Sequence, residues 1–220
     1  MFLITGLSCT LLLSAVTVLF SSLLGSVISV MKLSKFAPLR WLATAFIEII
    51  RGTPLLLQLY LLVFVLPQLL PGLNSLLKDQ LGLSSTDRQV MWVCIAMIIN
   101  SSAYVAEIIR SGIQAVDKGQ TEAARSLGMS GSQTMLRIVL PQAIKNIIPA
   151  LCNEFVSVIK ETSLASTFFV GDLMTQYKLI NGSTYLTIEP LFICGVIYFV
   201  VTFTLSKIIA VYERSLHHDD

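Results

Sequence analysis

Four long stretches without a charged side chain constrain this chain more than any other feature. They run over residues 1–31, 52–77, 89–106 and 190–206. Each supplies most of the roughly 20 consecutive apolar residues that an α-helix needs to cross the hydrocarbon core of a bilayer. The pattern therefore predicts several membrane-spanning helices in one chain.

The composition supports the same conclusion and excludes several classes of protein. Of the 220 residues, 55% are hydrophobic and only 13% are charged, and the mean hydropathy is +0.79. A water-soluble domain of this length has too little interior to bury that much apolar surface. The composition thus excludes a soluble enzyme, a disordered tail, a disulfide-built secreted module and a nucleic-acid-binding protein, and leaves an integral membrane protein surrounded by lipid.

The positions of the cations predict the orientation of the spans. No Lys or Arg precedes Lys32, whereas a cleaved signal peptide begins with a basic segment, so we expect the first stretch to be a retained span. Lys32, Lys35 and Arg40 follow it, and the positive-inside rule places them in the cytoplasm and the N-terminus outside. We expect further spans at about 45–70, 89–112 and 190–212, with an outer loop at 71–88.

One more span is needed at about 144–170, because the third span ends in the cytoplasm and the last span must begin outside to return there. Hydropathy alone hardly identifies this helix. With that helix in place, the C-terminus lies in the cytoplasm and only three cations lie outside, namely Lys78, Arg88 and Lys178. The cations assigned to the cytoplasm are Lys32, Lys35, Arg40, Arg51, Arg110, Lys118, Arg125, Arg137, Lys145, Lys207 and Arg214. The sequence therefore predicts an all-α membrane protein with five spans, and residues 1–220 form one domain because no repeat or linker interrupts them.

Polar residues form a stripe on each of two predicted spans. Charged groups near the middle of a bilayer are costly and usually face a protein interior or a water-filled route. The first stripe consists of Asn100, Tyr104, Glu107 and Ser111, and the second of Glu154, Ser157 and Glu161 with Lys160 on its flank. Helical spacing puts the members of each stripe on one face, so we expect them to line a passage.

Two simpler interpretations stay open for these stripes. Polar side chains in spans also join helices to one another, and Lys160 would then neutralise Glu154 or Glu161 in a packed interior. Glu107 lies near the cytoplasmic end and has Arg110 within one helical turn as a possible partner.

No residues with the pattern of a metal or catalytic site are found. The four cysteines, Cys9, Cys94, Cys152 and Cys194, lie in apolar runs without close-spaced pairs, which is typical of small buried hydrophobic residues. No set of nucleophile, base and orienting residue stands out, and no phosphate-binding Gly-x-x-x-x-Gly-Lys-Ser/Thr loop occurs. We therefore expect a non-enzymatic chain without a metal or cofactor of its own.

The segment between the third and fourth spans predicts a compact helical hairpin at about 117–141. A short Ala-rich helix is expected from Thr121 to Leu127, and Gly128 supplies the left-handed position past its end. Ser130 and Gln133 have the spacing of a capping box for a second helix, which Pro141 stops or kinks.

The residues of this hairpin match in full the EAA signature of permease subunits of ABC importers. The matching residues are Glu122, Ala123, Ala124, Gly128, Ile138, Leu140 and Pro141. The chain as a whole resembles the permeases of polar amino acid importers of the histidine, glutamine and arginine type. Further segments with the order and spacing of that family are RGTP at 51–54 followed by LLLQLY, NSSAYVAEIIRSGI at 100–113, and KETSL at 160–164.

The resemblance implies a fold, partners and a location. It implies the type I ABC importer permease fold, of the MetI-like kind, in the bacterial cytoplasmic (inner) membrane. The EAA hairpin would be a coupling helix seated in a groove of a separate ATPase subunit, which binds ATP and Mg. A second permease, identical or paralogous, and an extracytoplasmic solute-binding protein would complete the assembly.

The sequence analysis therefore predicts the permease subunit of an ATP-driven importer of polar amino acids that works by alternating access. The candidate contacts for substrate are Asn100, Tyr104, Glu154, Ser157, Lys160 and Glu161. The alternatives are an ABC permease for another small solute, or a gradient-driven carrier or channel, neither of which needs a docking hairpin for an ATPase.

Overall fold

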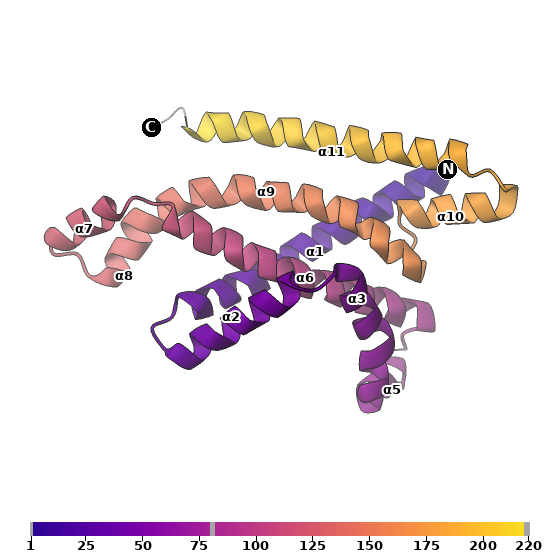
Figure 1. The fold of residues 1–220 in the computed structure, drawn as a ribbon, viewed down its shortest axis with the longest axis horizontal. Helices are drawn as coiled ribbons and strands as arrows, with labels where there is room; N and C mark the ends of the chain where they lie inside the picture. Colours follow the sequence, from indigo (N-terminus) through magenta and orange to yellow (C-terminus); the bar gives the residue numbers. More distant parts are fainter. Residues whose placement is uncertain (1, 80–81, 218–220) are drawn as a thin grey trace.

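The computed structural model describes residues 2–79 and 82–217, and within them every regular element is a helix. Figure 1 shows their arrangement. The elements are α1 (Phe2–Leu33), α2 (Ala37–Arg51), α3 (Leu55–Tyr60), η1 (Leu61–Val65), α4 (Leu66–Leu69), α5 (Pro71–Asp79), α6 (Ser85–Gln114), α7 (Lys118–Ser126), α8 (Gly131–Thr134), η2 (Met135–Val139), α9 (Leu140–Ala165), η3 (Ser166–Phe168), α10 (Leu173–Thr184) and α11 (Ile188–His217).

Four of the described helices are long and apolar enough to cross a membrane. They are Phe2–Leu33, Ser85–Gln114, the continuous stretch Gly131–Phe168, and Ile188–Ser215. A fifth candidate is a pair of helices, Ala37–Arg51 and Leu55–Leu69, bent by 103° at the break between them. The predicted all-helical membrane fold is confirmed.

The second predicted span, at about 45–70, is broken within its length. α2 ends at Arg51 and α3 begins at Leu55, so the RGTP segment forms the break between two helices, and Thr53 and Pro54 stand at a helix start as their sequence suggests. Pro54 has no backbone N–H to continue the ladder. The Thr53 hydroxyl donates to the Ile49 carbonyl at 2.8 Å, and the Gln58 amide donates to the Ile50 carbonyl at 2.8 Å, which satisfies carbonyls that the break leaves free.

The fourth span also differs from its prediction, because it is continuous with the second helix of the hairpin. Pro141 does not stop that helix: it lies in the first turn of α9 and is preceded by the π-helical turn η2, and the helical stretch continues from Gly131 to Phe168. A proline is tolerated in the first turn of an α-helix, and a π turn is a usual irregularity within one. Outside the spans, the predicted outer loop contains α5, and Arg88 lies in α6 instead. The sequence analysis did not predict α10.

Packing centres on α1 and α6, which make the most extensive helix–helix contact. Gly25 permits this approach, since a Cβ there would lie 2.7 Å from Val105 Cγ1 and 2.9 Å from the Ser102 carbonyl oxygen. The larger core cluster joins α1, α3, η1, α6 and α9. In Figure 1, α11 runs beside α9 toward the side on which α7 and α8 project, whereas α3, α5 and the start of α6 lie on the other side.

Candidate functional site

The break between α2 and α3 is joined to the middle of α6 by buried amides. Asn100 Nδ2 donates to Gln58 Oε1 at 2.9 Å, and both side chains are buried. Beside this pair, the Arg51 guanidinium lies over the Tyr104 ring at 5.4 Å from its centroid. The structure thus places two of the predicted pathway residues, Asn100 and Tyr104, at the broken helix. Sequence reasoning missed Gln58, although it is the only amide in the apolar run LLLQLY.

A second polar chain connects three spans. The Ser21 hydroxyl of α1 donates to the Ser101 hydroxyl of α6 at 3.2 Å, and Ser101 donates to Glu154 Oε1 of α9 at 2.8 Å. Glu154 is therefore bound within the helix bundle, to the residue of α6 that follows Asn100. The two serines were absent from the predicted set because hydroxyls are unremarkable in an apolar helix.

The remaining predicted residues of α9 are less constrained. Ser157 and Glu161 are partly buried and Lys160 is exposed. Across 2–79 and 82–217, none of the three makes a recorded hydrogen bond or ion pair, so the alternative of a closed Lys160 ion pair with Glu154 or Glu161 is not what the structure contains.

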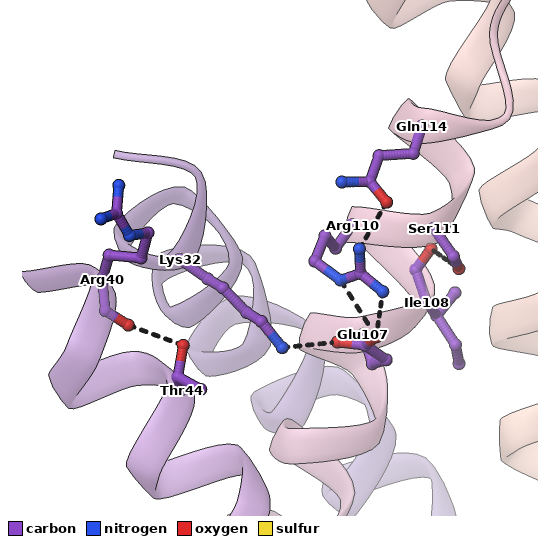
Figure 2. A network of polar contacts seen from close by, with 8 residues as sticks. All are labelled: Lys32, Arg40, Thr44, Glu107, Ile108, Arg110, Ser111 and Gln114. Carbon is purple, nitrogen blue, oxygen red and sulfur yellow. Dashed lines mark hydrogen bonds and ion pairs between the residues drawn. The ribbon is translucent and has the colours of Figure 1, made fainter. Parts of the chain in front are cut away.

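Glu107 belongs to a different cluster, at the end of α6 nearest the hairpin. Its carboxylate pairs with Lys32 of α1 at 3.0 Å and with Arg110, which in turn donates to Gln114 (Figure 2). Ser111 donates to the Ile108 carbonyl of its own helix at 3.0 Å. The alternative interpretation of Glu107 as a partner of Arg110 is thus the observed one, and the first stripe is divided between two sites.

The hairpin has the local structure that its sequence predicts. Asp117 caps α7, and Gly128 adopts φ +84° just beyond it, with its N–H donating to the Arg125 carbonyl at 3.1 Å. Ser130 and Gln133 form both bonds of the capping box, at 3.3 and 2.8 Å. The first helix begins at Lys118, three residues before the predicted start.

The hairpin also presents a partly apolar surface. Among its signature residues Ala124 is buried and Ile138 and Leu140 are partly buried. Glu122, Ala123, Gly128 and Pro141 are exposed. Leu127 is 85% exposed and Leu136 is 63% exposed. Such apolar side chains on a projecting helical pair are typical of a docking surface.

A buried carboxyl orders the turn between α9 and α10. Asp172 is fully buried and caps α10 by accepting from the Met174 and Thr175 N–H groups at 3.0 and 3.3 Å and from the Thr175 hydroxyl. Burial raises the pKa of this carboxyl above its usual value, against the lowering effect of these bonds. Thr10 of α1 accepts from the Leu173 N–H at 3.0 Å, which fastens the turn to the first span. No pattern in the sequence indicated this site.

The described residues contain no group of three or more His, Cys, Asp or Glu side chains suited to a metal ion.

Residues 7–218 match the family described as binding-protein-dependent transport system inner membrane component. The arginine transport system permease protein ArtQ of Bacillus subtilis (strain 168) is 40% identical over 220 residues, which is 100% of this chain and 94% of that protein. The probable glutamine ABC transporter permease protein GlnM of the same organism is 40% identical over 207 residues, which is 94% of this chain and 89% of that protein.

Two solved structures resemble the chain along its length. A chain in the crystal structure of an amino acid ABC transporter with histidines has a TM-score of 0.84 and 45% sequence identity, covering 97% of this chain and 94% of that one. A chain of the MetNI methionine ABC transporter in an inward-facing conformation has a TM-score of 0.78 at 15% identity, covering 98% and 96%. The second likeness shows a shared fold.

Proposed function

Because this chain belongs to the family of binding-protein-dependent transport system inner membrane components, we infer that it is the membrane-spanning permease subunit of an ABC importer for amino acids. The observation that carries the inference is the 40% identity to an arginine permease across the whole chain. The relatives named for arginine, glutamine and L-cystine all concern polar amino acids, which we propose as the substrate class.

We propose that the substrate passes along the polar surfaces of α6 and α9. The candidate contacts are Asn100, Tyr104, Glu154, Ser157, Lys160 and Glu161, joined by Gln58. The positions of these residues support the proposal. The Gln58–Asn100 bond joins the broken helix to the middle of α6, and the Ser101–Glu154 bond joins the next residue of α6 to α9. Broken helices at mid-membrane depth are typical of transporter binding sites, because they expose backbone and polar groups to a cavity.

We further propose that the hairpin couples this passage to a separate ATPase. Its projecting position and the exposed Glu122, Leu127 and Leu136 support a docking role. In this proposal the signature residues Glu122, Ala123, Ala124, Gly128, Ile138, Leu140 and Pro141 shape the hairpin that contacts the ATPase. ATP and Mg bind to that partner, and its closure draws the hairpins of two permeases together and opens the passage outward.

The orientation belongs to the same proposal. With the hairpin in the cytoplasm of a bacterium, the end of α11 lies on the same side and the start of α1 on the opposite side (Figure 1). The chain then spans its inner membrane as a single permease domain with the N-terminus outside. A second permease and an extracytoplasmic solute-binding protein complete the importer.

The test is affinity purification of a tagged chain from native membranes in mild detergent, followed by mass spectrometry. We expect an ATPase with a phosphate-binding loop to co-purify, and to be lost in the double variant Glu122→Arg, Gly128→Val. The matched control is Gly131→Ala, because a Cβ at Gly131 meets nothing within 4 Å. Recovery of the chain alone, in conditions that preserve other complexes, would contradict the proposal.

A transport assay separates the importer from a gradient-driven carrier or channel. Uptake should require ATP and be indifferent to a protonophore when ATP is held constant. Gly128→Val should keep membrane insertion and ATP hydrolysis by the partner but lose uptake, since φ +84° disfavours a β-branched residue. Normal uptake by that variant would refute the coupling role.

A further inference from the structure

A pocket of about 200 Å³ lies between η1 and the first turns of α6. Its apolar wall comes from Val63, Phe64 and Pro67, and its polar wall from Ser85, Arg88, Gln89 and Trp92 of α6. The start of α6 lies on the side of the molecule away from α7 and α8 (Figure 1). The pocket therefore lies at the end of the bundle opposite the hairpin.

The polar wall contains a cation without a counter-charge and a buried donor without an acceptor. Arg88 Nη1 donates to the Leu83 carbonyl at 2.8 Å, but no carboxylate of the described residues lies within 4.0 Å of its guanidinium. Trp92 is 5% exposed, and its buried indole N–H has no partner in the part of the chain that the structure describes. A buried donor without an acceptor and a half-buried cation without a counter-charge are both costly, so they are usually matched by a ligand or partner.

We propose that this pocket receives an acidic side chain of the solute-binding protein that delivers the amino acid, a proposal that rests on the proposed function. A guanidinium binds a carboxylate through charge-assisted and often bidentate hydrogen bonds, and Gln89 and Trp92 add an amide and an indole to the same wall. The pocket contains no acidic side chain of its own, so the ammonium group of a free amino acid would find no counter-charge there. A side-chain carboxylate carries no such group, and a protein arriving from outside meets this end of the bundle first.

The pocket wall packs against the segment that follows α9, the helix that carries several candidate pathway residues. Phe64 forms part of the pocket wall and packs against Phe168 at a ring-centroid distance of 5.7 Å, just past the end of α9. Tyr60 completes the aromatic cluster, at 5.3 Å from Phe168. Docking at Arg88 is thus transmitted by packed rings to α9, where Glu154 and Glu161 lie.

The experiment uses the assembled importer in nanodiscs and its own solute-binding protein loaded with amino acid. The measurement is the concentration of that protein that half-maximally stimulates ATP hydrolysis. We expect Arg88→Gln to raise this concentration about tenfold and Trp92→Phe about threefold, because each removes donors from a charged acceptor. Trp92→Phe keeps the Arg88–Leu83 bond, so it reports on the pocket without disturbing that loop. Lys78→Gln removes an exposed cation outside the pocket and should behave as wild type.

A second arm tests a free amino acid as the occupant. In a Trp41→Phe background Trp92 is the only tryptophan, since the chain has two, and its fluorescence reports on the pocket. Titration with free arginine or glutamine, without the solute-binding protein, should leave the fluorescence unchanged. A saturable change would overturn the assignment to a protein side chain.

The possible outcomes distinguish a failure of the pocket proposal from a failure of the proposed function. Wild-type half-maximal concentrations for both Arg88→Gln and Trp92→Phe, in an importer that the solute-binding protein does stimulate, overturn the pocket alone. Absence of any stimulation in the wild-type importer overturns the proposed function and the pocket with it.

Discussion

The close approach of α1 to α6 at Gly25 gives a prediction that tests the packing of the whole bundle. A methyl group added by Gly25→Ala would lie 2.7 and 2.8 Å from two carbon atoms of Val105 and 2.9 Å from the Ser102 carbonyl oxygen. Ordinary contacts begin near 3.4 Å, and neither the carbonyl nor the Val105 Cβ belongs to a flexible chain end. The two helices must therefore separate by about half an ångström along their main contact, which loosens close-packed neighbours.

The magnitude follows from two opposing effects. Overpacking of a tight core costs about 1–3 kcal/mol, whereas alanine is favoured over glycine in a helix by up to about 1 kcal/mol. We expect Gly25→Ala to lower the free energy of unfolding by about 1–2 kcal/mol. The same substitution at Gly195 of α11 meets nothing within 4 Å and should be neutral or stabilising by about 0.5–1 kcal/mol.

Gly112 provides a second case. A Cβ there would lie 2.4 Å from Ile147 Cγ1, whereas the nearest backbone atom, the Ala143 carbonyl oxygen, is 3.5 Å away. Gly112→Ala should also destabilise the chain, because the β-branched Ile147 has little χ1 freedom in a helix. The assay is equilibrium unfolding of the purified chain in mixed detergent micelles, followed by circular dichroism. Equal stability of Gly25→Ala and Gly195→Ala would refute the reasoning, because the two sites differ in contacts and not in helix position.

Three further predictions concern charged and polar groups. A double-mutant cycle of Lys32→Met and Glu107→Gln, read by the same unfolding assay, should give a coupling energy of about 1–2 kcal/mol, since this ion pair is mostly shielded from solvent; additive effects would contradict it. Ser157→Cys, in a chain whose four cysteines are replaced, should react with a water-borne thiol reagent in at least one transport state, and inertness in every state would exclude it from the passage. Burial raises the pKa of Asp172, so its carboxyl stabilises the fold most below its unfolded pKa of about 3.9 and loses that contribution as pH rises through the folded pKa. The Tm of wild type relative to Asp172→Asn should therefore fall as pH rises from about 4, and a difference that rises or stays constant would contradict this.

The sequence predicts those parts of the fold that depend on local chemistry. Charge-free runs of apolar residues identify four of the five candidate spans, because the cost of burying charge in lipid acts on each segment independently of the others, whereas the charged span at about 144–170 follows only from the parity of the topology. The hairpin is predicted in detail for the same reason: the capping box of Ser130 and Gln133 and the left-handed Gly128 are properties of four or five consecutive residues. The identification of the family also rests on this segment, and the comparisons confirm it.

Features that depend on contacts between residues far apart in the chain could not be predicted from the sequence. Hydropathy does not record helix direction, so the 103° break is invisible to it even though Gly52 and Pro54 mark the place. The buried Gln58 is explained by its hydrogen bond with Asn100, which lies 42 residues away in the sequence. The role of Asp172 depends on burial beside Thr10, at the other end of the chain. α10 is too polar for a span and too short for a clear helical periodicity.

The candidate pathway residues differ in the free energy that a contact with substrate would cost. Some of them would first have to break a bond within the chain, and others would not. Glu107 would have to leave two cations, and Asn100 would have to exchange its bond with Gln58. Breaking a shielded charged or amide pair leaves the abandoned partner unsatisfied, which costs more than the bond contributed. No hydrogen bond or ion pair in 2–79 and 82–217 engages Ser157, Lys160 or Glu161. In the proposed passage these three residues would therefore exchange partners with a solute at the lowest cost, whereas Asn100 and Glu154 would also have to give up the bonds that join α6 to α3 and α9.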